Sequence, residues 1–179
     1  MIKRFFLALA IVVCGAVAIV LVLASGKPDS FQVVRSISIK APPEKIYPLI
    51  DDLKGWTAWS PYENKDPDMK RSFGPVTAGK GAYYAWEGDK NVGKGSMEIV
   101  EVVQPSKVVI KLDFDEPFPA HNMVDFTLVP QGDATLVSWN MHGPVPFVAK
   151  IFHVLFDMDK MVGQDFEVGL HNLKGLAER

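Results

Sequence analysis

The chain has 179 residues, of which 48% are hydrophobic, with 19 basic and 21 acidic residues and a formal net charge of −2. This composition is typical of a folded globular protein and excludes a disordered or collagen-like chain. Because the sequence has no broad basic face, no zinc-knuckle motif and no aromatic-basic motif, nucleic acid is not expected as a partner.

The first predicted element is an uncharged apolar segment, residues 5–24, with the sequence FFLALAIVVCGAVAIVLVLA. A helix of that length crosses a hydrocarbon core of about 30 Å. The segment is longer than the apolar region of a signal peptide, and its end is a poor fit to a small-x-small cleavage site. We therefore favour a single-pass anchor in the cell (inner) membrane, with a signal sequence as the alternative. Lys3 and Arg4 precede it, so the positive-inside bias places the remainder in the periplasm or outside the cell.

This segment also sets the predicted domain boundaries. Residues 1–26 form the anchor, residues 27–30 a linker and residues 31–179 one domain that stays close to the membrane. Cys14 is the only cysteine and lies within the apolar segment. Neither an intramolecular disulfide nor a nucleophilic cysteine is therefore expected in the domain.

A strand and a short helix are predicted next. Residues 31–39 alternate apolar and polar side chains with period two, as in a strand. Prolines and Glu44 then begin a helix, which Pro48 should kink or end near Ile50. The pair Trp56 and Trp59 follows, and we expect these indoles to close one end of the domain and pack on the long C-terminal helix, as structural groups rather than ligand contacts.

An antiparallel meander and a long helix complete the prediction. Glycine, proline or asparagine separates strand-like segments at hairpin spacing, namely 69–74, 80–88, 94–103, 107–115, 121–130 and 134–142. From about Phe147 to Leu176 the apolar residues recur with a 3.6-residue period, which predicts one amphipathic helix.

Several segments, in this order, resemble a known family. They read IKAPPEKIYPLIDDLKGWTAWSPYE, GAYYAWEGDKNVGKGSMEIVEVVQP, VVIKLDFDEPF, TLVSWNMHG and FDMDKMVGQDFEVGLHNLK. Over residues 31–175 the chain is similar to the START-like SRPBCC superfamily, in its bacterial polyketide cyclase/dehydrase-like branch. The resemblance implies an α+β helix-grip fold, in which a curved antiparallel sheet of about seven strands surrounds a long C-terminal helix. It also implies an apolar cavity of the kind that the superfamily uses for lipids, sterols, hormones and polyketides.

Strand parity predicts which side chains line such a cavity. Polar Lys111 and Asp113 mark the outer face of their strand, so the residues between them face inward. Each inward residue could instead be ordinary core, but Tyr84, Asn122 and Trp139 have polar groups that need partners once buried. The predicted lining is Tyr84, Trp86, Ile110, Leu112, Phe114, Asn122, Val124, Phe126, Trp139 and Met141 on the strands, with Ile151 and Leu155 on the helix.

No catalytic residue can be assigned from the sequence. It contains no serine-elbow, zinc-protease, P-loop or dinucleotide motif, and neither a metal nor a cofactor is expected. The four histidines are expected on the surface. Arg35 and Asp165 should both be partly buried, and we expect them to pair with each other or to satisfy backbone ends, with an acid/base or ligand-orienting role as the alternative.

Phe152 and Phe156 fall to one side of the apolar stripe of the long helix. They could flank the cavity mouth, pack under the short helices or touch the bilayer surface.

These patterns lead to a functional prediction. We expect a membrane-anchored protein that binds a hydrophobic small molecule or lipid. The alternatives are an enzyme of the polyketide cyclase/dehydratase type and a ligand-free interaction or stress-response module. A cavity with converging polar groups would favour one of the first two.

Overall fold

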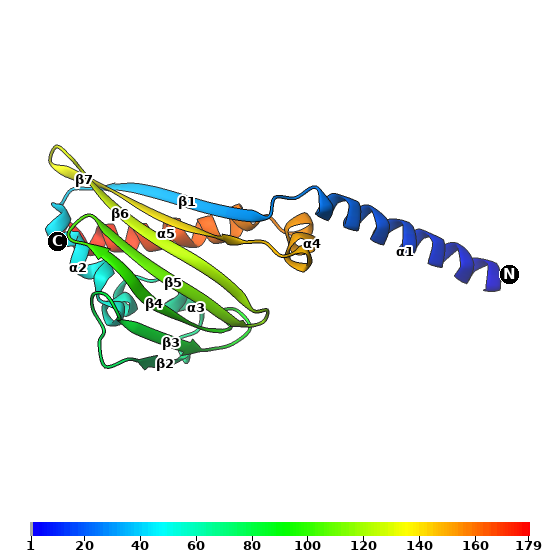
Figure 1. The fold of residues 1–179 in the computed structure, drawn as a ribbon, viewed down its shortest axis with the longest axis horizontal. Helices are drawn as coiled ribbons and strands as arrows, with labels where there is room; N and C mark the ends of the chain where they lie inside the picture. The colour runs from blue at the N-terminus through cyan, green and yellow to red at the C-terminus, as the bar shows by residue number, and fades with distance from the viewer. Residues whose placement is uncertain (1) are drawn as a thin grey trace. The chain divides into compact units, whose positions relative to one another are not determined.

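A computed structural model describes residues 2–179 (Figure 1). The backbone divides into two compact units. One contains the chain up to Phe31 together with Pro144–Met158, and the other contains Gln32–Gly143 together with Asp159–Arg179. Each unit is described separately.

The larger unit is built on a seven-stranded antiparallel sheet. Its order is β1-β7-β6-β5-β4-β3-β2. Each strand from β2 to β7 therefore pairs with its neighbours in the sequence, and β1 pairs with β7 at one edge. Register shifts between β4 and β5 mark bulges, which bend a sheet. The strands are β1 Ser30–Ile39, β2 Lys70–Phe73, β3 Tyr83–Glu87, β4 Lys94–Val103, β5 Lys107–Glu116, β6 Ala120–Gln131 and β7 Ala134–Pro144. The predicted meander is therefore confirmed.

Three short helical segments connect β1 to β2. They are α2 Pro43–Asp51, the 3-10 helix η1 Leu53–Ala58 and α3 Tyr62–Lys65. Helix α2 contains Pro48 and ends at Asp51, close to the end that this proline predicts. The apolar face of α2 is buried through Ile46, Tyr47 and Ile50.

The predicted helix over 147–176 is wrong as a single element. The structure has α4 Phe147–Leu155 and α5 Met158–Ala177, because Phe156 adopts φ −129° and ψ 137° and interrupts the helical hydrogen bonds. The apolar repeat continues through this break, so periodicity could not reveal it. Asp157, which directly precedes α5, is of a residue type favoured at helix starts and could have indicated that a new helix begins there. Helix α5 packs on the sheet, where Phe166 stacks on Trp139 of β7 with ring centroids 4.1 Å apart.

The smaller unit contains α1 Ile2–Ser25 and α4, which contact each other. Within the described residues, one helical segment, Lys3–Ser25, is long and apolar enough to cross a bilayer, a test that a signal sequence also passes. The boundaries predicted at residues 26 and 30 stay a prediction.

Candidate functional site

Five aromatic side chains meet between the sheet and α5, and we call them the aromatic cluster. Trp56 of η1 and Trp59, which follows its end, lie 4.7 Å apart between ring centroids, and both contact Phe126 and Trp139 of the sheet at 5.6 to 6.1 Å. Phe166 of α5 completes the set through its stack on Trp139. All five are buried. The cluster therefore fills this part of the concave face with protein atoms.

The indole N–H groups of Trp56 and Trp59 both have hydrogen-bond partners. Trp56 Nε1 donates to Ile50 O at 2.9 Å, and Trp59 Nε1 donates to Leu49 O at 2.8 Å. These carbonyls lie in the last turn of α2, where a helix leaves acceptors without intrahelical partners. The contacts fit the structural role expected for both residues. Their rings contact aromatic residues of the sheet, and α5 reaches the same region, because Asn172 Nδ2 donates to Trp59 O at 3.1 Å.

Trp139 differs from these two tryptophans. Its Nε1 is buried and has no hydrogen-bond partner among the described residues. Gly169 of α5 leaves room for the ring, because a Cβ at that position would lie 2.7 Å from Trp139 Cζ3. An unpaired buried donor costs about 1–3 kcal/mol, so an acceptor placed at this N–H would remove that cost.

A second set of rings continues along the same face over β2, β3 and β5, and we call it the aromatic wall. Phe73, Tyr84, Trp86 and Phe114 follow one another with centroid separations of 5.1, 6.0 and 5.6 Å. Tyr84 and Trp86 are buried, whereas Phe73 and Phe114 are half-buried. Gly95 opposite Trp86 makes room for the indole, whose Nε1 donates to Val92 O at 3.0 Å. Unlike the cluster, the wall is only partly covered.

Polar groups border the wall at Tyr84. Glu63 of α3 acts electrostatically on the Tyr84 hydroxyl, and Glu63 Oε2 accepts from Arg71 Nε of β2 at 2.7 Å. Burial, followed by the negative charge of Glu63, raises the pKa of Tyr84 above its ordinary value of 10.0. Tyr84 therefore stays protonated at neutral pH. Sequence reasoning missed Glu63, Arg71 and Phe73, although Arg71 and Phe73 share the inward parity of β2, opposite Trp86 and Tyr84.

Most of the predicted lining lies on the concave face. Ile110, Val124 and Met141 are buried beside the residues described above, Asn122 is 7% exposed, and Leu112 is half-buried. Ile151 and Leu155 are different, because the helix break places them on α4 in the smaller unit rather than on α5. Their assignment to the cavity lining assumed one continuous C-terminal helix, and that assumption is wrong.

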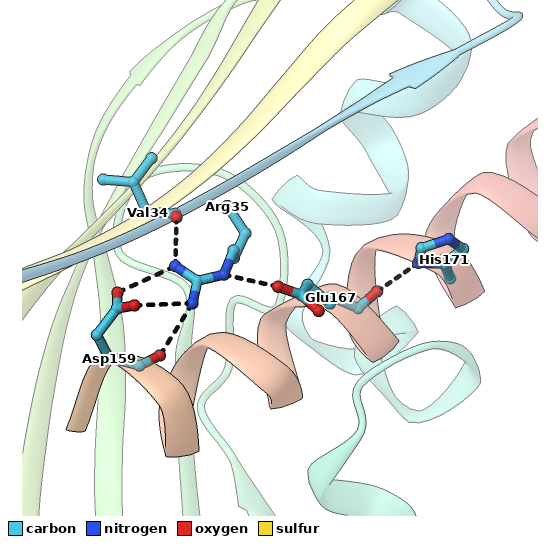
Figure 2. A network of polar contacts seen from close by, with 5 residues as sticks. All are labelled: Val34, Arg35, Asp159, Glu167 and His171. Carbon is cyan, nitrogen blue, oxygen red and sulfur yellow. Dashed lines mark hydrogen bonds and ion pairs between the residues drawn. The ribbon is translucent and has the colours of Figure 1, made fainter. Parts of the chain in front are cut away.

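The expected pairing of Arg35 with Asp165 is also wrong. Figure 2 shows Arg35 of β1 joined to α5 by Asp159 and Glu167 instead. Its guanidinium donates to Glu167 Oε1 at 2.8 Å, to both carboxylate oxygens and the carbonyl of Asp159 at 3.0 Å, and to Val34 O at 2.8 Å. Gly163 leaves space for this group, since a Cβ there would lie 2.0 Å from Arg35 Nη2.

Asp165 has a different partner. Its Oδ2 accepts from Lys65 Nζ of α3 at 2.6 Å, and the same ammonium lies 5.3 Å from the centre of the Tyr62 ring. Helix α3 is thus tied to α5 through Lys65 and to β2 through Glu63.

The remaining polar candidates lie away from the concave face. His121 and His142 pair with Asp113 and Asp125 at 2.7 and 3.0 Å and have exposed side chains, as their outward parity predicts. Among the described residues, no group of three or more histidine, cysteine, aspartate or glutamate side chains is arranged to hold a metal ion.

A surface depression of about 580 Å³ lies elsewhere on the larger unit. It borders the start of α2 and the β4–β5 and β6–β7 turns, through residues such as Pro42, Pro105 and Pro130. None of the residues in the predicted lining borders it.

Comparison with solved structures supports the fold. A protein from Thermobifida fusca is 21% identical, with a TM-score of 0.61 over 80% of this chain and 90% of that one. A protein from Chromobacterium violaceum is 17% identical, with a TM-score of 0.58 over 86% and 99%. The Aha1 dimer from Colwellia psychrerythraea is 18% identical, with a TM-score of 0.56 over 83% and 96%.

Sequence comparison identifies the family. No curated protein matches the chain. The family model described as polyketide cyclase / dehydrase and lipid transport matches residues 30–178, which include the whole sheet, the short helices and α5. The helix-grip arrangement and the SRPBCC-type resemblance are thereby confirmed, and the chain belongs to the polyketide cyclase/dehydrase and lipid transport family.

Proposed function

We propose that this protein is a membrane-anchored carrier or receptor that binds a hydrophobic small molecule or lipid against the concave face of its sheet. The family to which it belongs includes lipid transport in its description. The aromatic wall supplies an apolar surface that is only partly covered by the protein's own side chains.

The observation that carries this proposal is the unpaired Nε1 of Trp139. It is buried beside Phe126 and Phe166 and has no partner among the described residues. A ligand with a carbonyl or hydroxyl oxygen would accept this hydrogen bond, which would remove the cost of the unsatisfied donor. The expected ligand therefore has an apolar body and at least one acceptor.

The polar groups beside the wall favour binding over catalysis. Glu63 forms a hydrogen bond and an ion pair with Arg71, so it is not a free base. Tyr84 remains protonated, because burial and the negative charge of Glu63 raise its pKa. This arrangement can orient a ligand but offers no unengaged acid and base pair.

The anchor is the remaining part of the proposal. Lys3–Ser25 has the length and composition of a span, and none of its most apolar window is buried within the protein. A helix that exposes such a surface requires an apolar surrounding. With Lys3 and Arg4 on the cytoplasmic side, the domain of residues 31–179 lies in the periplasm or outside the cell.

Native mass spectrometry of the full chain, purified in detergent from its membranes, tests the binding proposal. The protein is expected to carry apolar molecules, and Trp139→Phe is expected to lower their occupancy while the folded state persists. Tyr83→Phe serves as the control, because Tyr83 lies on the outward parity of β3 and is 40% exposed. A protein that carries no molecule and takes up no added fatty acid or apolar dye would contradict the proposal.

A further inference from the structure

Helix α4 presents an unusual surface for a protein in water. Large apolar side chains are exposed along it, with Val148 70% and Leu155 61% exposed. Phe147, Phe152 and Phe156 are also exposed, and the last two rings stack with centroids 5.2 Å apart. A continuous set of exposed apolar groups marks a surface that contacts something other than water.

The polar side chains of α4 are turned away from this exposed apolar surface. Lys150 is its only charged residue, and the Lys150 side chain is 10% exposed. Its Nζ donates to Asp29 Oδ1 at 2.6 Å, and this contact lowers the pKa of Asp29. His153 is half-buried and contacts Phe31 edge-on, with ring centroids 6.0 Å apart. Helix α4 thus turns its charge inward and its apolar residues outward, the reverse of a water-facing helix.

The partner of α4 inside its own unit is the end of α1. The two helices contact each other, and Ala24 in the last turn of α1 is fully buried. The connection behind them is fixed as well, because Val145 N donates to Asp29 O at 2.7 Å. Leu21, Val22 and Leu23 at that end of α1 remain exposed, so apolar surface continues from α1 to α4.

We propose that α4 docks in the interfacial layer of the bilayer that α1 spans, with Val148 and Leu155 facing the acyl chains. The inference rests on the proposed anchor, because the end of α1 sets the depth of α4. A short helix with one strongly apolar face, held beside the exit of a span, has the properties of an interfacial helix. The continuous apolar surface of α1 and α4 favours lipid over a second copy of the chain or another protein.

Site-directed fluorescence on the full chain tests this docking. Cys14 is replaced by alanine, and a single cysteine is introduced by Leu155→Cys or, in a second protein, Val148→Cys. Each is labelled with an environment-sensitive dye and reconstituted in phosphatidylcholine/phosphatidylglycerol vesicles. Val129→Cys is the control, because Val129 is an exposed apolar residue of β6 and is 50% exposed.

The expected result is a blue-shifted emission at both α4 positions, strong quenching by lipids that carry a nitroxide near the headgroup and a loss of quenching by aqueous iodide. The label at Val129→Cys should show water-exposed emission and iodide quenching. Iodide quenching of both α4 labels at the level of the control would overturn the proposal. Protection from both quenchers would also overturn it, because a protein partner would then cover α4.

Alkaline carbonate extraction of the same vesicles separates this inference from the proposed anchor. If the chain is released, α1 does not span the bilayer, and both proposals fail. If the chain is retained while the α4 labels stay in water, the anchor stands and only the docking of α4 is refuted.

Discussion

The aromatic cluster and the aromatic wall are made from the same residue types on the same face of one sheet, but they differ in coverage. The cluster is enclosed by η1, the sheet and α5, and its rings are buried. In the wall, Phe73 and Phe114 remain half-buried. Inward parity therefore does not decide whether an aromatic residue stabilises the fold or offers a binding surface. The elements packed opposite it decide this.

Truncation of one residue in each region should give the largest contrast. Trp59→Ala removes a ring that is 1% exposed and its hydrogen bond to Leu49 O, so unfolding free energy should fall by about 3–5 kcal/mol. Phe114→Ala removes a half-buried ring and should cost only about 1–2 kcal/mol. Urea denaturation of the full chain in mild detergent measures both changes. Equal losses would remove the distinction between the two regions.

Binding should respond in the opposite order. Phe114→Ala removes part of the proposed ligand surface and should weaken the uptake of an apolar dye, measured under conditions where both proteins are folded. A Trp59→Ala protein that stays folded keeps both the wall and the unpaired Nε1 of Trp139, so it should bind nearly as well as the wild type. Dye affinity that falls only in Trp59→Ala would show that the wall is not part of the ligand surface.

Substitution of two glycines of α5 tests how tightly the cluster is packed, with smaller expected changes in stability. A Cβ at Gly169 would meet Trp139 Cζ3 at 2.7 Å and Pro61 Cδ at 3.0 Å, so Gly169→Ala should destabilise the protein by about 1–3 kcal/mol through overpacking of the cluster. At Gly175 a Cβ meets nothing within 4 Å. Gly175→Ala should therefore stabilise the helix by up to about 1 kcal/mol. Thermal unfolding of the two variants tests whether the cluster is as tightly packed as its distances indicate.

The smallest predicted effect concerns the attachment of α5 to β1. Hydrogen bonds from Arg35 lower the pKa of Asp159 from its ordinary value of 3.8. A carboxyl group with a lowered folded pKa stabilises the protein above its unfolded pKa, and this contribution disappears as the pH falls through the folded pKa. Asp159→Asn should therefore lower the melting temperature at neutral pH, slightly because Asp159 is 62% exposed. The difference should shrink below about pH 4, whereas a constant difference would exclude the ion pair as its cause.

The sequence predicted the strands and their inward faces well because both depend on local patterns. Alternation of polar and apolar residues identified Tyr84, Trp86 and Trp139 as inward, and the structure buries all three. Proline and tryptophan spacing likewise located the end of α2 and the residues that pack behind it.

The features that the sequence could not predict depend on distances between elements. Periodicity assigned Arg35 and Asp165 to faces, but the register of β1 against α5 determines that Arg35 meets Asp159 and Glu167. The apolar repeat continues across the helix break at Phe156, so the repeat alone could not predict the break. The coverage of the wall also depends on where α3 and α5 lie, and the alternation of residues along a strand does not predict the position of a helix.

The most direct test of the account uses the indole N–H resonances of its four tryptophans. Trp56, Trp59 and Trp86 donate to backbone carbonyls, whereas Trp139 has no partner among the described residues. In ¹H–¹⁵N spectra of the full chain in detergent, titration with a co-purified lipid or a fatty acid should move the Trp139 resonance downfield and leave those of Trp56 and Trp59 in place. A ligand that binds while the Trp139 resonance stays unchanged would contradict the proposed site.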